Sequence, residues 1–255
     1  MSLQISVITA VLNRVKTLGD SLRSVHEQSW SDVEHIVVDG GSTDGTLDVI
    51  DRHKSGIAKL SSSADKGPYH ALNKGISYAS GDVVGFMHAD DMFASTSALE
   101  RVAHAFEDPA VGAVYGDLVY VRKEDSSQVI RYWRAGQYQR DQLTLGWMPP
   151  HPTFYVRREL YQRYGDFNTR YKIAADYDHM LRLLWRGRVQ AAYIPEVLVR
   201  MRMGGISNGS VFNILNKSRE DYSAMRENGI GGLQTLLLKN VSKLPQFMVR
   251  PAPVR

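Results

Sequence analysis

Residues 82–93 read Asp-Val-Val-Gly-Phe-Met-His-Ala-Asp-Asp-Met-Phe, and this stretch is the most informative one in the chain. Its apolar run, 83–87, has the length of a buried strand and ends abruptly in the polar residues of 88–91. Adjacent carboxylates repel each other and are costly to remove from water, so packing alone does not explain them. A hard divalent metal ion between them makes such crowding tolerable. The stretch therefore predicts a buried strand with a metal-bridged diphosphate site at its carboxyl end.

The composition is that of an ordinary globular protein. The chain has 255 residues, of which 43% are hydrophobic and 23% charged, and this suits one α/β domain with elaborations. No run of about 18 uncharged apolar residues occurs, so we expect no membrane-spanning helix. The absence of cysteine excludes disulfides and thiolate chemistry. We expect a cytoplasmic protein, either free or peripheral at the inner face of the plasma membrane.

The net charge of +4 belongs entirely to residues 233–255, and residues 1–232 are formally neutral. The basic residues of this tail, which has no acidic ones, are Lys239, Lys243, Arg250 and Arg255. A neutral body offers no nucleic-acid-binding face. Because the tail mixes leucines with lysines, it fits a helix at a membrane surface. It fits equally a helix packed on the body or on a second subunit of a homodimer.

The first half of the sequence alternates strand and helix patterns. The expected strands are 3–9, 34–39, 57–62, 82–87 and 112–117, and the expected helices are 14–28, 46–53, 68–79 and 97–107. This order predicts a parallel sheet with helices on both faces. The second half is less regular. Its expected strands are 118–122, 129–133 and 191–199, and its expected helices are 157–164, 176–185 and 210–227.

Polar groups follow each of the first four expected strands. They are Asn13, the segment 39–45, Asp65 and the segment 88–91. Ligands of open parallel sheets bind beyond the carboxyl ends of the strands, so we expect these groups to meet there. The Gly-x-Gly-x-x-Gly spacing of dinucleotide sites is missing, and so is a Gly-Lys-Ser/Thr phosphate loop. An EF-hand is rejected because Asp44 occupies the position that must be glycine.

Four successive segments resemble the motifs of family 2 glycosyltransferases of the GT-A type. They are Ile5-Ser-Val-Ile-Thr-Ala-Val-Leu-Asn-Arg, Glu34-His-Ile-Val-Val-Asp-Gly-Gly-Ser-Thr-Asp-Gly-Thr, Asp65-Lys-Gly-Pro-Tyr-His-Ala-Leu-Asn-Lys-Gly-Ile and Gly81-Asp-Val-Val-Gly-Phe-Met-His-Ala-Asp-Asp. The resemblance covers roughly residues 3–210. It implies a Rossmann-like, mostly parallel sheet flanked by helices, with a less regular acceptor-binding second half. It also implies a catalytic domain over 1–210, divided near 117 into a nucleotide-binding and an acceptor half, before a helical tail, 211–255.

The resemblance further implies an inverting transfer of a sugar from a nucleotide diphosphate to a hydroxyl of a saccharide or lipid-linked acceptor. The setting it implies is polysaccharide or lipid-linked oligosaccharide assembly. Carried over by position, Thr9 and Asn13 would line the nucleotide pocket. Asp39 would accept a hydrogen bond from the nucleobase, Asp65 would lie beside it, and Ala89 would belong to the same pocket.

By the same resemblance, Asp90 would hold the metal that bridges the two phosphates. His88 stands where the first aspartate of the usual Asp-x-Asp motif is expected. Imidazole suits Mn²⁺ better than Mg²⁺, so we expect manganese, with magnesium as the alternative. His88 equally suits a hydrogen bond to the ribose, and both roles stay open.

The segment Ile173-Ala-Ala-Asp-Tyr-Asp-His-Met-Leu-Arg-Leu is similar to the acidic motif of the family, and Asp176 matches its catalytic base. An inverting transfer needs one carboxylate to take the proton of the acceptor hydroxyl. His151, within Pro149-Pro-His-Pro-Thr, matches a loop near the acceptor. Arg202 matches a late loop, 200–207, that can close over the diphosphate, where a guanidinium suits phosphate oxygens.

Purely structural roles compete with these functional assignments. Aspartates at strand ends commonly begin turns or cap helices, which would account for Asp39, Asp90 and Asp176. A nucleotidyltransferase also uses metal and carboxylates, but it would normally show a Gly-rich basic loop after the first strand. A non-catalytic module that binds sugar nucleotides or glycans is a further alternative, and the presence of Asp176 argues against it.

Overall fold

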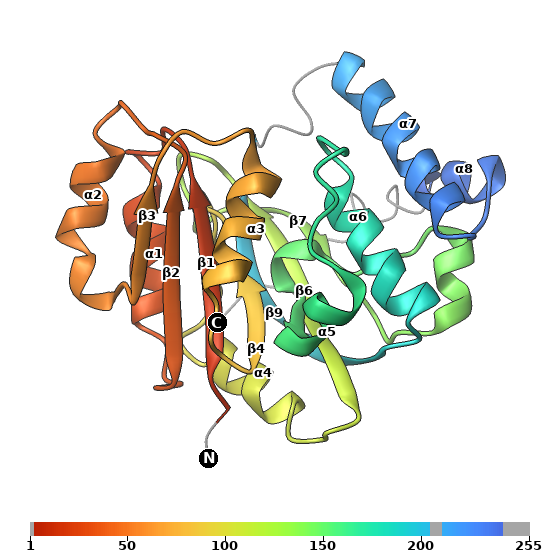
Figure 1. Cartoon of the computed structure of the whole chain (residues 1–255), viewed down its shortest axis with the longest axis horizontal. Helices are drawn as coiled ribbons and strands as arrows, with labels where there is room; N and C mark the ends of the chain where they lie inside the picture. Colours follow the sequence, from red (N-terminus) through yellow and green to blue (C-terminus); the bar gives the residue numbers. More distant parts are fainter. Residues whose placement is uncertain (1–2, 205–210, 242–255) are drawn as a thin grey trace.

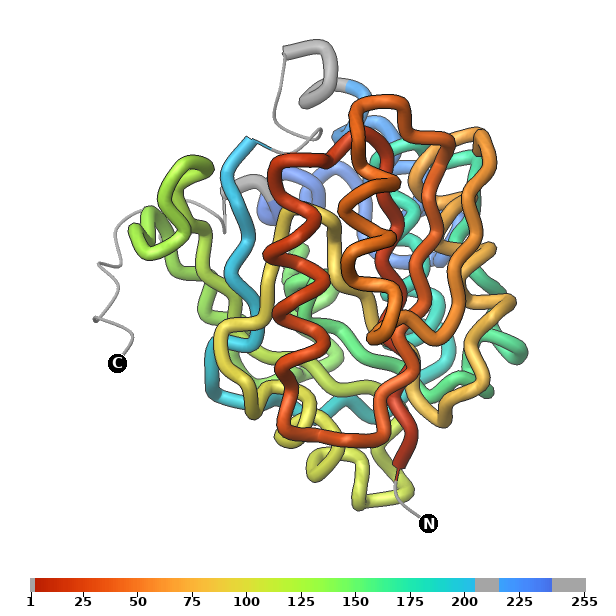
Figure 2. The backbone as a smooth tube through the Cα atoms, turned by 90° about the vertical axis from the view of Figure 1, so that its left-hand side faces the viewer, coloured from red at the N-terminus to blue at the C-terminus, as the bar shows by residue number. Residues whose placement is uncertain are grey.

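The computed structural model describes residues 3–204 and 211–241. These residues form one nine-stranded sheet in the order β3-β2-β1-β4-β8-β6-β9-β5, with β7 paired to β6 (Figure 1). Figure 2 shows the same chain from the side of β3 and α2. The expected α/β class, a sheet flanked by helices, is confirmed.

The first half contains four parallel strands in the order β3-β2-β1-β4. They are β1 (Ile5–Val11), β2 (Val33–Asp39), β3 (Lys59–Ser62) and β4 (Val83–Phe86). The register pairs Val11 with Asp39 and Asp39 with Ser62, so three strands end level with one another. Apolar side chains on both faces of β1, β2 and β4 are fully buried, as expected of a parallel sheet covered on both sides.

Helices from the first half pack on opposite faces of these strands. They are α1 (Leu18–His26), α2 (Thr46–Arg52), η1 (Lys54–Gly56), α3 (Pro68–Tyr78) and α4 (Ala98–Ala105). Helix α3 packs Ala71, Leu72 and Ile76 against Ile8 and Ile36. Helices α1 and α2 pack on the opposite face, which presents the odd-numbered residues of β1 and β2. Successive side chains of a strand point to opposite faces of the sheet, so even-numbered residues of β1 and β2 pack against α3 and odd-numbered ones against α1 and α2.

Five further strands of mixed direction complete the sheet. They are β5 (Met92–Phe93), β6 (Val111–Val121), β7 (Val129–Trp133), β8 (Tyr155–Arg157) and β9 (Gln190–Arg202). Strands β6 and β9 pair in parallel over their length, whereas β8 is antiparallel to both β4 and β6. The remaining elements are η2 (Arg140–Leu145), η3 (His151–Thr153), α5 (Arg158–Tyr164), α6 (Ala175–Met180), the π-helical turn η4 (Leu181–Arg186), α7 (Val211–Glu227) and α8 (Leu233–Val241).

Several sequence expectations were wrong in detail. The two strands expected at 112–117 and 118–122 are one strand, β6, because β9 pairs along its whole length. The helix expected over 176–185 changes to a π-helical turn at Leu181. The strands β5 and β8 are too short to show a periodic pattern, and neither was expected.

One basic residue of the tail, in the part that the structure describes, is buried rather than exposed. Lys239 on α8 is 1% exposed and forms an ion pair with Asp221 of α7 at 2.8 Å. Its ammonium lies 3.1 Å from the ring centroid of Tyr177 on α6. Burial lowers the pKa of Lys239 to about 8, although Asp221 opposes this effect. Lys239 is therefore packed in the interior, and residues 242–255, which contain the other three basic residues of the tail, lie outside the described residues.

Candidate active site

The carboxyl ends of β1 and β2 are joined by side-chain to backbone hydrogen bonds. Asn13 adopts a positive φ of 52° just after β1. Its amide oxygen accepts from the N–H of Thr43 at 2.9 Å, and its own N–H donates to Oγ of Ser42 at 2.8 Å. Asn13 is exposed at this edge, so its side chain lies where a ligand of the sheet would bind.

Asp39 and Asp65 lie on the two sides of Gly40. The Asp39 carboxylate is fully buried and accepts from the N–H groups of Gly41 and Ser42 and from the Ser62 hydroxyl, at 2.7 to 3.3 Å. A Cβ at Gly40 would lie 2.7 Å from Oδ2 of Asp65, so a larger residue there would displace the Asp65 side chain. Asp39 therefore organises the turn in this structure, Asp65 lies against the glycine that follows it, and their expected contacts with a nucleobase stay a prediction.

Thr9 does not face this edge. Its side chain is fully buried on the α1/α2 face, and its hydroxyl lies 3.0 Å from Nε2 of His35. The other ring nitrogen of His35 lies 3.0 Å from Nε2 of His26. Burial, reinforced by His26 and His53, lowers the pKa of His35 to about 3. Thr9 thus contacts the buried ring of His35 rather than lining an open pocket.

The residues after β4 form a tight turn held by α1. The N–H of Asp91 donates to the carbonyl of His88 at 3.0 Å, and the hydroxyl of Thr17, just before α1, donates to the carbonyl of Ala89 at 3.1 Å. Asp90 keeps 32% of its side chain exposed, and its only ion-pair contact among the described residues is Arg14 at 3.9 Å. Asp90 is therefore the carboxylate of this turn that remains available to a ligand.

Asp91 has a different environment from its neighbour. It is 1% exposed, and burial together with the charge of Asp90 raises its pKa well above the usual range. Arg202 donates its backbone N–H to Asp91 at 3.1 Å and its Nη1 to the carbonyl of Asp90 at 3.1 Å. The same guanidinium pairs with Asp20 of α1 at 2.6 Å. Arg202 therefore supports the acidic turn, whereas its expected contact with a diphosphate stays a prediction.

His88, His151 and Asp176 come together although they are distant in sequence. The ring centroids of His88 and His151 lie 5.6 Å apart, and His151 stacks on Phe86 at 5.5 Å. Burial lowers the pKa of His151 to about 4, and the negative charge of Asp176 opposes this. Burial likewise lowers the pKa of His88, against the charges of Asp90 and Asp176. Two imidazoles and two carboxylates therefore share one electrostatic environment.

Asp176 lies in the first turn of α6. Its Oδ1 accepts from the N–H of Tyr177 at 2.8 Å and lies 3.4 Å from the hydroxyl of Tyr69 on α3. The Tyr69 hydroxyl donates at 2.7 Å to the carbonyl of Ile173, just before α6. The sequence alone did not single out Tyr69, although the segment Asp65-Lys-Gly-Pro-Tyr places it four residues after Asp65.

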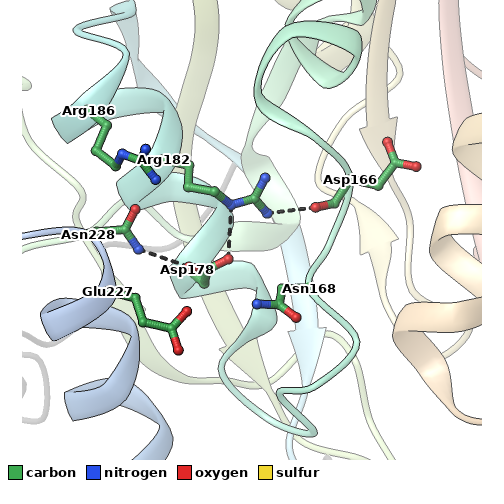
Figure 3. A pocket seen from close by; sticks show the side chains of 7 residues that line it. All are labelled: Asp166, Asn168, Asp178, Arg182, Arg186, Glu227 and Asn228. Atoms are coloured by element: carbon green, nitrogen blue, oxygen red, sulfur yellow. Dashed lines mark hydrogen bonds and ion pairs between the residues drawn. The ribbon is translucent and has the colours of Figure 1, made fainter.

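A polar cavity lies beside α6. It is lined by Asp166, Asn168, Asp178, Arg182, Arg186, Glu227 and Asn228 (Figure 3). Asp178 accepts from Arg182 at 2.9 Å and from Nδ2 of Asn228 at 2.9 Å. Arg182 also donates to the carbonyls of Tyr164, Gly165 and Asp166. The bonds of Asp178 to Arg182 and to Asn228 therefore join α6 to the end of α7 at this cavity.

The comparisons with known proteins define the class of the protein. The family model, the named relatives and a fold shared with solved glycosyltransferases show that the protein is a glycosyltransferase. The family model described as glycosyl transferase family 2 matches residues 6–179. The chain therefore belongs to glycosyl transferase family 2.

Relatives and solved structures agree with this assignment. The chain is 32% identical over 209 residues to the PGL/p-HBAD biosynthesis glycosyltransferase of Mycobacterium tuberculosis, covering 80% of this chain and 78% of that protein. It is similar in fold to S. aureus TarS 1–349 in complex with UDP-GlcNAc, with a TM-score of 0.67, 18% identity and coverage of 89% of this chain and 65% of that one. It also resembles the mannosyltransferase PcManGT from Pyrobaculum calidifontis in complex with GDP-Man and Mn²⁺, with a TM-score of 0.64, 18% identity and coverage of 99% and 77%.

Proposed function

We propose that the protein is an inverting, GT-A-type glycosyltransferase whose base is Asp176. The observation that supports this most directly is the convergence of Asp176 with His88 and Asp90, because it brings a carboxylate from α6 to the carboxyl end of β4. A donor diphosphate beside Asp90 would leave the anomeric carbon facing Asp176. The carboxylate would take the proton of the acceptor hydroxyl as that oxygen attacks in line.

The donor is proposed to be a nucleotide sugar held at the ends of β1 to β4. The solved structures that share this fold are described with UDP-GlcNAc and with GDP-Man, which supports this class of donor without selecting the base. Asn13 and Asp65 are the side chains at this edge that we assign to the nucleoside. Asp39 contributes through the turn that it organises, since its carboxylate oxygens are already bonded to that turn and to Ser62.

A divalent metal ion fits the site only together with the donor. Among residues 3–204 and 211–241, no three His, Asp or Glu side chains are grouped to hold a metal ion by themselves. Asp90 and His88 would supply two donor atoms, a hard oxygen and an imidazole nitrogen, which together suit Mn²⁺. The Mn²⁺ described with the mannosyltransferase supports this choice. When bound, such an ion would neutralise charge on the departing diphosphate.

The acceptor is proposed to be a saccharide or a lipid-linked saccharide. His151 shares the environment of His88 and Asp176, and its Nε2 has no hydrogen-bond partner among the described residues. A buried polar atom of this kind is costly unless a ligand satisfies it, so we assign Nε2 of His151 to a hydroxyl of the acceptor or of the donor sugar.

A lipid-linked acceptor would agree with the surface of α8. Leu233, Leu237 and Leu238 are 67%, 65% and 44% exposed. No helix in the described part of the chain is long and apolar enough to cross a bilayer. Contact with a membrane surface would therefore depend on these leucines and on residues 242–255, rather than on Lys239.

The decisive experiment compares Asp176→Asn with the wild-type enzyme. Transfer should fall by roughly 100- to 10,000-fold, the usual contribution of a general base, while the affinity for the nucleotide sugar stays the same. The donor is first identified by a thermal-shift screen of nucleotide sugars with Mn²⁺. The matched control is Glu159→Gln, which alters an exposed first-turn carboxylate of α5 and should not change transfer. Unchanged transfer by Asp176→Asn would contradict the assignment of Asp176 as the base.

A further inference from the structure

One carboxylate from a distant helix accepts several backbone N–H groups of the loop that leads into the helix of the proposed base. Glu220 of α7 accepts three backbone N–H groups, from Lys172 at 3.1 Å, Ile173 at 2.8 Å and Ala174 at 3.0 Å. These are the last three residues before α6, and Asp176 is the second residue of that helix. Glu220 therefore fixes the backbone two residues from the proposed base.

Helix α6 has no capping side chain at its N-cap position. Its N-cap residue is Ala174, which has no side-chain hydrogen-bond acceptor, and only six residues are α-helical before the π-helical turn. Unpaired N–H groups at a helix start are normally satisfied by a capping side chain, and a negative charge there also interacts favourably with the helix dipole. Glu220, from a different helix, binds the N–H of the N-cap residue Ala174 and places a negative charge beside this helix start, whereas the first-turn N–H of Tyr177 donates to Asp176 itself.

Two further contacts join the same helix to α7 and α8. Asn228, just after α7, donates to Asp178 of α6, as Figure 3 shows. The Lys239–Asp221 ion pair places an ammonium against the ring of Tyr177, the residue after Asp176. Residues of α7 and α8 thus hold α6 at several points, whereas Tyr69 reaches the start of α6 from α3.

We propose that Glu220 is a positioning residue that sets the location of Asp176, and that α7 and α8 are working parts of the catalytic unit. This inference rests on the proposed role of Asp176 as the base. Proton transfer requires hydrogen-bond distance to the acceptor hydroxyl, and a displacement of about 1 Å at a reacting group can cost roughly 100-fold in rate. Helix α7 lies outside residues 6–179, which the family model covers, so the family motifs do not contain this residue.

The test measures kcat, donor affinity and amide hydrogen exchange for Glu220→Ala and Glu220→Gln. We expect Glu220→Ala to lower kcat by roughly 30- to 100-fold, with donor affinity within about twofold of wild type. Glu220→Gln keeps one acceptor oxygen and should lie between Ala and wild type. Exchange should accelerate in peptides that cover 170–176, and this readout does not depend on catalysis.

The matched control is Glu227→Gln on the same helix. Glu227 pairs with Arg170 at 3.1 Å, so it binds the same loop, but through an ion pair whose side chains are 43% and 73% exposed. Exposed pairs contribute little, and we expect kcat to change by less than about twofold. Equal losses in Glu220→Ala and Glu227→Gln would overturn the inference, because general loosening of the loop would then explain both.

Failure of the inference is distinguishable from failure of the proposed function. If exchange accelerates at 170–176 in Glu220→Ala while kcat stays at the wild-type value, Glu220 is structural only and the inference is wrong. If Asp176→Asn keeps wild-type transfer while Glu220→Ala loses it, the assigned base is wrong, and Glu220 then does not act through Asp176. Loss of transfer in both, with donor binding intact and partial rescue by Gln, supports the inference.

Discussion

The first half of the molecule, residues 3–117, and the second half, residues 118–204 with 211–241, build their parts of the site in different ways. In the first half, parallel strands end level with one another, and the polar residues that follow them meet because of that register. In the second half, the helix of Asp176 depends on Glu220, Asp221 and Asn228, which lie 44 to 52 positions beyond Asp176 in sequence. The proposed donor side is thus positioned by the register of neighbouring parallel strands, and the proposed base by contacts with helices that come later in the sequence.

Asp90→Ala should give the largest effect on donor binding and tests whether the first half alone binds the donor. We expect the affinity for the nucleotide sugar in Mn²⁺ to fall at least about 100-fold, because Asp90 is the exposed carboxylate of the turn. Calorimetry with Mn²⁺ and with chelator measures this. The control, Asp82→Asn, alters a carboxylate at the opposite end of β4 and should bind normally. Equal affinity of the wild type with and without metal would contradict the prediction.

His35 should make the first half sensitive to acid. Its pKa is lowered from 6.5 to about 3 by burial, so the unfolded chain binds a proton below pH 6.5 that the folded chain does not. Stability should therefore fall as the pH drops below 6.5, by at most about 1.4 kcal/mol per pH unit from this residue. Urea unfolding between pH 7 and pH 5 measures the slope. His35→Gln should flatten it, whereas the exposed His104→Gln should not.

His151→Phe tests the junction between the two halves. Phenylalanine keeps the stacking on Phe86 but removes the nitrogen that we assign to a substrate hydroxyl. We expect kcat to fall by about tenfold, the value of one hydrogen bond, with donor affinity little changed. Steady-state kinetics and donor calorimetry separate the two effects. An unchanged kcat would mean that His151 serves only in packing. A large loss of donor affinity would mean that His151 belongs to the donor site formed by the first half.

Leu237→Ser should have the smallest effect. Its side chain is 65% exposed, so the melting temperature should stay the same, while co-sedimentation with anionic liposomes should fall by about threefold. Leu236 of the same helix packs partly against the core, and Leu236→Ser should lower stability instead. Equal sedimentation of Leu237→Ser and the wild type would contradict the hypothesis that α8 contacts a membrane.

The sequence by itself predicted the α/β class, the strands that carry Asp39 and His88, and the family motifs. This was feasible because apolar periodicity reports burial, and parallel strands necessarily present their carboxyl ends along one edge. The structure brings Asp39, Asp65 and the 88–91 turn to that edge, as expected. The sequence could not show which face of the sheet the Thr9 side chain occupies. A strand residue can face either helical layer, and only the packing of α1 and α2 places Thr9 and His35 together on their side of the sheet.

Only the tertiary structure decided how the proposed base is held and how the described part of the tail packs. Periodicity shows that Glu220 lies on a helix, but not that its carboxylate meets the N–H groups of residues 172–174. Lys239 looks like a solvated charge in sequence, yet Asp221 and Tyr177 bury it. In both cases a polar group is compensated by a partner distant in sequence, and that pairing exists only once the helices have packed.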